Sequence, residues 1–111
     1  MKKYLFVFVF AYFFVSSPIN AAVYKGHKVF TRVCYECHES GHFFVAKKTM
    51  YQWKKLMKSK GKGLAKLHLK SKKAKKSWKY FKSKKYTRKT KHLRDFLVEY
   101  AKDSGNVPAC N

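Results

Sequence analysis

Acidic side chains are scarce in this sequence. Five Asp and Glu residues stand against 27 Lys and Arg, so the formal charge is +22, and no acidic residue lies between Ser40 and Arg94. Unpaired positive charge repels itself and destabilises the compact state of a protein. A surface that only keeps the protein soluble does not account for so large an imbalance, and we expect the lysines to face a partner.

Segments with alternating apolar and polar residues, the pattern of a half-buried strand, are also missing. Their absence excludes the βαβ frame in which a redox Cys-x-x-Cys enzyme carries its motif. No internal repeat is present. With 111 residues the chain has room for one small domain, and the sequence predicts an all-α fold.

The chain has no apolar run long enough to span a membrane comfortably, since the run from Tyr4 to Val15 falls short of about 20 residues. Lys2 and Lys3 precede this run, and a stretch of small residues from Ser16 to Ala22 follows it. These features are typical of a secretory signal. We therefore predict a signal peptide over residues 1–21, a mature domain over 22–111 and a periplasmic location, with an uncleaved anchor as the alternative.

The sequence Cys34-Tyr35-Glu36-Cys37-His38 is the attachment signature of a c-type haem. Residues three apart on a helical turn share one face, so both thiols can reach the vinyl groups of one porphyrin. His38 then supplies the proximal iron ligand. A covalently held haem would also compensate for the small core of such a short domain.

Helical spacing marks several segments. Val23 to Tyr35 is predicted as a helix, and Gly26 within it indicates close approach of another backbone. Gly41 to Lys48 is expected to be a loop, and Thr49 to cap a helix that ends near Ser59. Narrow apolar stripes at helical spacing follow over residues 64–85, and residues 86–90 are expected to form a loop. A last helix is marked by Leu93, Phe96, Leu97 and Tyr100, and we expect it to stop at Gly105, with Pro108 preventing its continuation.

With these residues the chain resembles the small class I cytochromes c. Members of that family open with a helix that carries a Gly, an aromatic residue and the attachment motif at four-residue intervals, here Gly26, Phe30 and Cys34. They close with a helix whose Leu and aromatic residues cross the first helix at that Gly, and Leu97 and Tyr100 are similar. The resemblance implies a bundle of about three to five short helices around one haem c.

The resemblance covers about residues 22–42 and 91–105 and leaves the middle of the chain unaligned. In that family the sixth iron ligand is usually a Met in the loop before the last helix, but Ser77 to His92 contains no Met. The resemblance to short haem domains with a Thr, a Trp and a Met after the motif ranks Met57 first as distal ligand. Met50 ranks second and His68 third, and a Lys or an open position remains an alternative.

Several side chains have two interpretations. Trp53 and Trp78 either donate an N–H to a haem propionate or anchor the core. His27, His42 and His92 are expected at the surface, with a propionate contact as an alternative for His42. If haem occupies the other two cysteines, Cys110 lacks a partner within the chain and becomes a candidate for a disulfide between two chains.

The sequence therefore predicts an exported monohaem cytochrome that carries single electrons and is not an enzyme. Its lysines would dock acidic redox proteins and attract anionic lipid surfaces, with no nucleic acid as partner. The alternative is a basic binding protein held together by zinc. Its metal site would combine Cys34, Cys37 and His42 with Cys110 or His68, and its lysines would contact phosphates or lipid.

Overall fold

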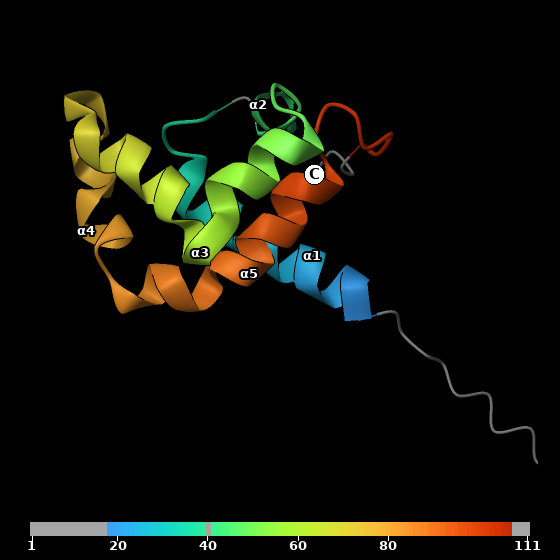
Figure 1. Cartoon of the computed structure of the whole chain (residues 1–111), viewed down its shortest axis with the longest axis horizontal. Helices are drawn as coiled ribbons and strands as arrows, with labels where there is room; N and C mark the ends of the chain where they lie inside the picture. The colour runs from blue at the N-terminus through green and yellow to red at the C-terminus, as the bar shows by residue number, and fades with distance from the viewer. Residues whose placement is uncertain (1–17, 40, 108–111) are drawn as a thin grey trace, which may run out of the picture.

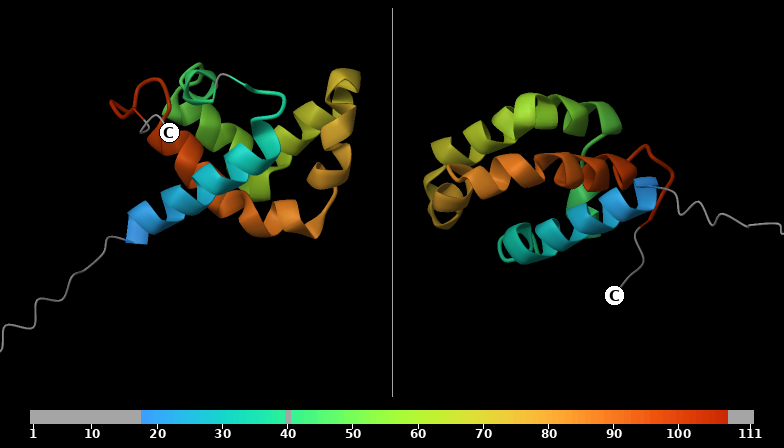
Figure 2. Two further views of the ribbon diagram at one scale, coloured as in Figure 1. Left: turned by 180° about the vertical axis from the view of Figure 1, so that it is seen from behind. Right: turned by 90° about the horizontal axis from the view of Figure 1, so that it is seen from below.

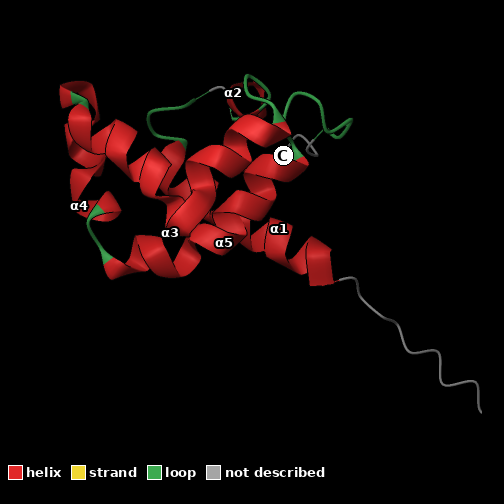
Figure 3. Ribbon diagram, in the orientation of Figure 1, coloured by secondary structure: helices red, strands yellow, loops and turns green. Residues whose placement is uncertain are grey.

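The computed structural model describes residues 18–39 and 41–107. Within these ranges the chain is helical and contains no strand (Figure 3), so the predicted all-α class is confirmed. The apolar run of the predicted signal peptide and Cys110 lie outside the described residues. In chain order the elements are α1 (Pro18–Val29), a π-helical turn η1 (Phe30–Cys34), α2 (His42–Val45), α3 (Met50–Lys70), a 3-10 helix η2 (Lys72–Ser77), α4 (Trp78–Phe81) and α5 (Lys84–Glu99).

Helix α5 lies at the centre of the fold and packs against both α1 and α3 (Figures 1 and 2). The contact between α1 and α5 depends on Gly26. A Cβ atom at this position would collide with the carbonyl oxygen of His92 and would lie 2.7 Å from the Cβ of Phe96. The predicted close approach at Gly26 is confirmed, with His92 and Phe96 beneath the glycine.

Helix α3 begins at the predicted residue. Thr49 accepts a hydrogen bond from the backbone N–H of Gln52 at 3.2 Å, and the Gln52 side chain accepts one from the N–H of Thr49 at 2.9 Å. This reciprocal pair is a capping box, which satisfies two backbone donors at the start of the helix. The backbone then leaves the helical region between Lys58 and Gly61. The predicted end near Ser59 is therefore a kink, after which the helix resumes.

Two predicted loops are helical instead. Residues 42–45 within the first form the short helix α2, and residues 86–90, the second, belong to α5. Ser83 caps α5 by accepting a hydrogen bond from the backbone N–H of Tyr86 at 3.3 Å. Because Tyr86 and Thr90 are buried and continue the spacing of Leu93, the apolar face of the last helix begins two turns earlier than predicted.

The core collects apolar side chains from α1, α3, α4 and α5 and from the segments beside them. Trp53 and Tyr86 are its largest fully buried members, each 1% exposed. Around them lie Val23, Phe30, Val45, Met57, Leu64, Phe81, Leu93, Phe96, Leu97 and Ala101. This core is modest, and next to it the fold leaves an apolar cavity.

Candidate haem-binding site

The attachment motif follows a change in helix type. At the end of α1 the chain widens into η1, where the N–H of Tyr35 bonds to the carbonyl of Phe30 at 3.0 Å. π-Helical turns of this kind occur frequently at functional sites. A tight turn follows, in which the N–H groups of Cys37 and His38 both bond to the carbonyl of Cys34, at 3.2 and 2.9 Å. The motif is thus one hydrogen-bonded unit.

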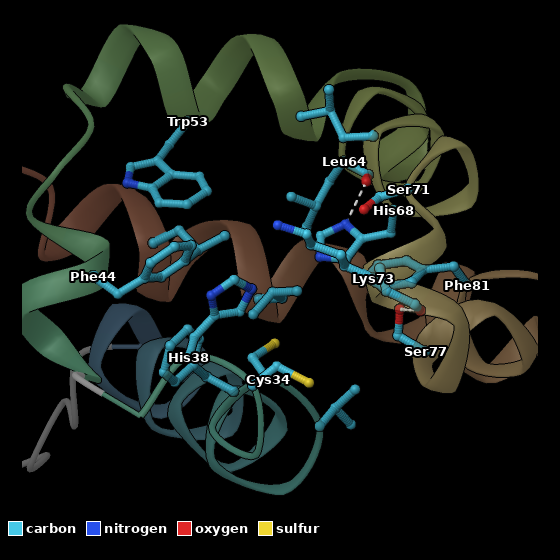
Figure 4. Close-up of a pocket in the computed structure, with 17 residues that line it drawn as sticks. Cys34, His38, Phe44, Trp53, Leu64, His68, Ser71, Lys73, Ser77 and Phe81 are labelled. Atoms are coloured by element: carbon cyan, nitrogen blue, oxygen red, sulfur yellow. Dashed lines mark hydrogen bonds between the residues drawn. The ribbon is translucent and has the colours of Figure 1, made fainter.

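The motif borders a cavity of about 410 Å³. This size falls within the range of small-molecule and cofactor pockets, roughly 300–1,000 Å³. Cys34 and His38 lie on one side of the cavity, and His68 and Phe81 come from the segments opposite (Figure 4). Cys37 also lines the cavity. The other lining residues are mainly apolar: Phe30, Val33, Phe44, Trp53, Leu64, Leu67, Ser71, Lys73, Ala74, Ser77, Leu93 and Leu97.

The two cysteines differ in exposure. Cys34 is half-buried and Cys37 is exposed. Burial, and then the neighbouring Cys37, raises the pKa of the Cys34 thiol to about 12. Both thiols are free and both line the same cavity. The motif therefore presents two thiols to one mainly apolar space.

His38 is half-buried and its ring stacks on Phe44 with the centroids 3.9 Å apart. Burial lowers the pKa of His38, with smaller contributions from His68 and Lys47. A lowered pKa favours the neutral imidazole, which is the form that binds a metal ion. His38 thus has the surroundings of a metal ligand at the edge of an apolar cavity.

His68 lies across the cavity from His38, in the part of α3 beyond the kink. The centroids of the two imidazole rings are 6.2 Å apart and the ring planes are at 87°. The Nδ1 of His68 is 2.8 Å from the carbonyl oxygen of Leu64, and its ring stacks on Phe81 at 4.2 Å. The structure thus brings together His38 and the residue ranked third as distal ligand.

The two methionines ranked higher do not line the cavity. Met57 is 3% exposed and belongs to the hydrophobic core. Met50 is the first residue of α3, and its backbone N–H donates to the carboxylate of Asp103 at 2.7 Å. The structure gives both the role of packing residues, which is common for a Met in a helix beside a core.

Both tryptophans use their indole N–H within the protein. Trp53 donates to the carbonyl of Val45 at 2.8 Å. Trp78 donates to the carbonyl oxygens of His68, at 2.8 Å, and Ser71, at 3.2 Å. Because these donors are satisfied, the structure favours anchoring over a propionate contact for Trp53 and Trp78. The sequence did not indicate that Trp78 holds the backbone of His68.

The remaining histidines lie outside the cavity lining. His42 packs beside Phe43, with ring centroids 4.3 Å apart. His27 packs on Phe96 at 5.3 Å, so it is only partly at the surface as predicted. His92 is also only partly at the surface: its Nδ1 is buried without a hydrogen-bond partner, and α1 packs over its backbone carbonyl at Gly26.

The described part of the chain contains no group of three or more His, Cys, Asp or Glu residues placed to hold a metal ion. The zinc set given as the alternative combines Cys34, Cys37 and His42 with Cys110 or His68. Its described members do not form such a group, and Cys110 lies outside the described residues. The donors at the cavity are two thiols and two facing imidazoles in apolar surroundings. By residue type this set would also suit a tetrahedral zinc ion, but the described groups are not placed to hold one ion together. Their position around one apolar cavity fits a haem held through thioethers.

The lysines of the 40–94 segment are mostly exposed. Across residues 18–39 and 41–107 one ion pair is formed, between Lys76 Nζ and Glu36 at 3.3 Å, and its side chains are 83% and 69% exposed. Exposed pairs contribute little stability. Lys73 reaches the cavity lining itself. Positive charge therefore stands uncompensated beside the motif.

Comparisons with models of known families, with curated proteins and with solved structures gave no match to this chain. The likeness to class I cytochromes c accordingly rests on the residues named above. No helix in the described ranges is both long enough and apolar enough to cross a membrane. The fold and site define a small all-helical protein with two thiols and two imidazoles around an apolar cavity.

Proposed function

We propose that this protein is an exported monohaem c-type cytochrome that carries single electrons between redox partners. The observation that carries the proposal is the position of Cys34, Cys37 and His38 at the wall of one apolar cavity of about 410 Å³. A covalently bound haem would supply the chemistry, by taking up and releasing one electron at its iron. The chain's own residues attach it, exclude water from it and present charge around it.

Attachment needs only the two thiols. Each S–H adds across one vinyl double bond of the porphyrin, so that a C–S bond forms and the hydrogen moves to the other vinyl carbon. No oxidant is consumed in this addition. His38, which follows Cys37 directly, is the proximal ligand in the proposal, and its lowered pKa favours the neutral ring that ligation requires.

The lysines serve docking in this proposal. Positive charge around a cofactor edge steers an acidic partner into contact and raises the rate of association at low salt. Lys73 at the cavity lining and the exposed Lys76 beside the motif are suitably placed. The same surface would attract anionic lipid headgroups. The signal-like residues 1–21 support export to the compartment where such attachment takes place.

Mass spectrometry tests the proposal directly. The full chain is expressed in a host able to install haem c, and we expect the purified protein to lack residues 1–21 and to carry one porphyrin that survives acid-acetone extraction. A variant with Cys34→Ser and Cys37→Ser should lose the covalent porphyrin, and Cys110→Ser should keep it. Extractable haem, or one zinc per chain instead of one iron, would overturn the proposal.

A further inference from the structure

We propose that His68 is the second axial ligand of this haem, so that two imidazoles, those of His38 and His68, bind the iron from opposite sides. The inference deepens the proposed function and rests on it, because it requires a haem attached at the motif. It replaces the methionine ranking that the sequence suggested. Its basis is the geometry of His68 within the cavity (Figure 4).

The spacing of the two rings is the first argument. Their centroids are 6.2 Å apart. Two imidazoles that share one metal ion through ring nitrogens, each bond being about 2 Å long, have their centroids roughly 6 Å apart. Both residues line the same cavity, which neither Met50 nor Met57 does.

The hydrogen bonding of His68 is the second argument. A carbonyl oxygen can only accept, so the 2.8 Å contact with Leu64 requires that Nδ1 of His68 carry the hydrogen. In the neutral ring Nε2 then holds the free lone pair. Metal-binding histidines almost always donate their other N–H to a carbonyl, a carboxylate or a water in this way. His68 is therefore held in the tautomer that a ligand needs.

The rigidity of His68 is the third argument. Phe81 stacks on its ring at 4.2 Å with 26° between the planes, and Trp78 donates a hydrogen bond to its carbonyl at 2.8 Å. A side chain fixed both at its ring and at its backbone is pre-organised for binding. These contacts explain why a histidine sits here in otherwise apolar surroundings. Ligation on both sides would close the iron to small molecules and suit an electron carrier.

The test uses the haem-loaded protein, after its mass has confirmed covalent attachment. We expect low-spin spectra in both oxidation states, no near-infrared band of methionine ligation in the ferric form, and no carbon monoxide binding in the ferrous form. With ring planes at 87°, the ferric protein should give the strongly anisotropic low-spin electron paramagnetic resonance signal of perpendicular imidazoles.

Two substitutions at His68 make the assignment specific. His68→Ala should become high-spin and bind carbon monoxide, and imidazole added to the solution should restore the low-spin spectrum. His68→Met should stay low-spin and show a raised reduction potential, because methionine ligation raises it. The matched controls Met57→Leu and Met50→Leu should keep the wild-type spectrum, and circular dichroism should show the same helix content in every variant.

Some outcomes would overturn the assignment and leave the proposed function intact. They are a methionine band that Met57→Leu or Met50→Leu removes, a His68→Ala spectrum identical to the wild type, or carbon monoxide binding by the unaltered protein. A low-spin spectrum that only Lys73→Ala abolishes would assign the position to lysine. Absence of covalent porphyrin in the mass measurement would instead overturn the proposed function itself.

Discussion

At the scale of single residues, the two motif cysteines occupy different surroundings, and this predicts different reactivity before haem is attached. Cys34 is half-buried with a pKa raised to about 12, whereas Cys37 is exposed. Since the thiolate is the reactive species, iodoacetamide at neutral pH should alkylate Cys37 faster than Cys34 in the haem-free chain, by about tenfold or more. Peptide mapping after short labelling times measures the two rates.

Two controls accompany this prediction: one replaces the neighbouring Cys37, and the other unfolds the chain in urea. In Cys37→Ser the labelling of Cys34 should remain slow, since burial is the main cause of its raised pKa. In concentrated urea the two thiols of the unaltered chain should react alike. Equal rates in the folded chain would contradict the burial of Cys34.

Because of Tyr86, we expect the stability of the protein to fall at alkaline pH. It is 1% exposed and donates a hydrogen bond to the carbonyl of Gly61 at 2.6 Å. Burial is the main cause that raises its pKa, so the folded state keeps a proton that the unfolded state loses near pH 10. The stability that this raised pKa contributes is fully present below about pH 10 and is lost as the pH rises above that value. Tyr80 acts in the same direction, with a pKa raised to about 12.

Tyr86→Phe should therefore lower the stability at neutral pH but reduce the further loss of stability at alkaline pH. At neutral pH it lowers the free energy of unfolding by about 1–3 kcal/mol, because the Gly61 carbonyl loses its partner. Between about pH 10 and 12 the variant should lose less stability than the wild type. Urea unfolding across this range measures both, with Tyr24→Phe, 59% exposed, as the matched control. Parallel pH curves for Tyr86→Phe and the wild type would refute this role of Tyr86.

At the scale of elements, the crossing of α1 over α5 depends on one missing side chain. Gly26→Ala would place a methyl group against the His92 carbonyl and Phe96. Overpacking of this kind costs about 1–3 kcal/mol, which exceeds the gain of up to about 1 kcal/mol in helix propensity. We expect a lower urea midpoint for Gly26→Ala. The exposed neighbour Lys25→Ala should leave it nearly unchanged, and a more stable Gly26→Ala would show that the helices do not touch there.

Local signals allowed some elements to be predicted from the sequence. The cap at Thr49, the close approach at Gly26 and the motif turn each depend on neighbouring residues, and the structure confirms the first two. The last helix begins two turns earlier than predicted and ends at Glu99, before the predicted stop at Gly105. The many lysines of its first half obscured the buried positions Tyr86 and Thr90, which lie against Gly61 of α3. Tyr86 also packs against Phe81.

The pairing of His38 with His68 could not be predicted locally, because it depends on the kink in α3. A straight helix would separate Trp53 and His68 by about 22 Å along its axis, yet both line one cavity. The kink contains Ser59 and Lys60 at positive φ, a conformation rare for residues other than glycine. Gly61 follows them at a φ of 72°, and Tyr86 and Thr90 of α5 lie against it. The sequence therefore indicated an interruption near Ser59 but not the direction in which the helix resumes.

At the scale of the whole molecule, the charge of +22 opposes folding, whereas in the proposed function it would favour docking. Repulsion among the lysines destabilises the folded chain, and the described residues contain one exposed ion pair to offset it. Screening should therefore stabilise the protein, so that the melting temperature rises between about 10 and 200 mM sodium chloride. The same screening should slow association with an acidic redox partner, because electrostatic steering weakens.

Charge reversal separates these two effects from general salt effects. A variant with Lys75→Glu and Lys79→Glu, both exposed, should melt higher than the wild type at low salt and depend less on salt. The same variant should associate more slowly with anionic vesicles, which serve as a defined acidic surface. Differential scanning calorimetry and stopped-flow mixing measure the two responses. A lower melting temperature in this variant would show that repulsion among these lysines does not destabilise the fold. Unchanged or faster association would show that they do not form a docking surface, because removing positive charge must weaken the attraction to an acidic surface.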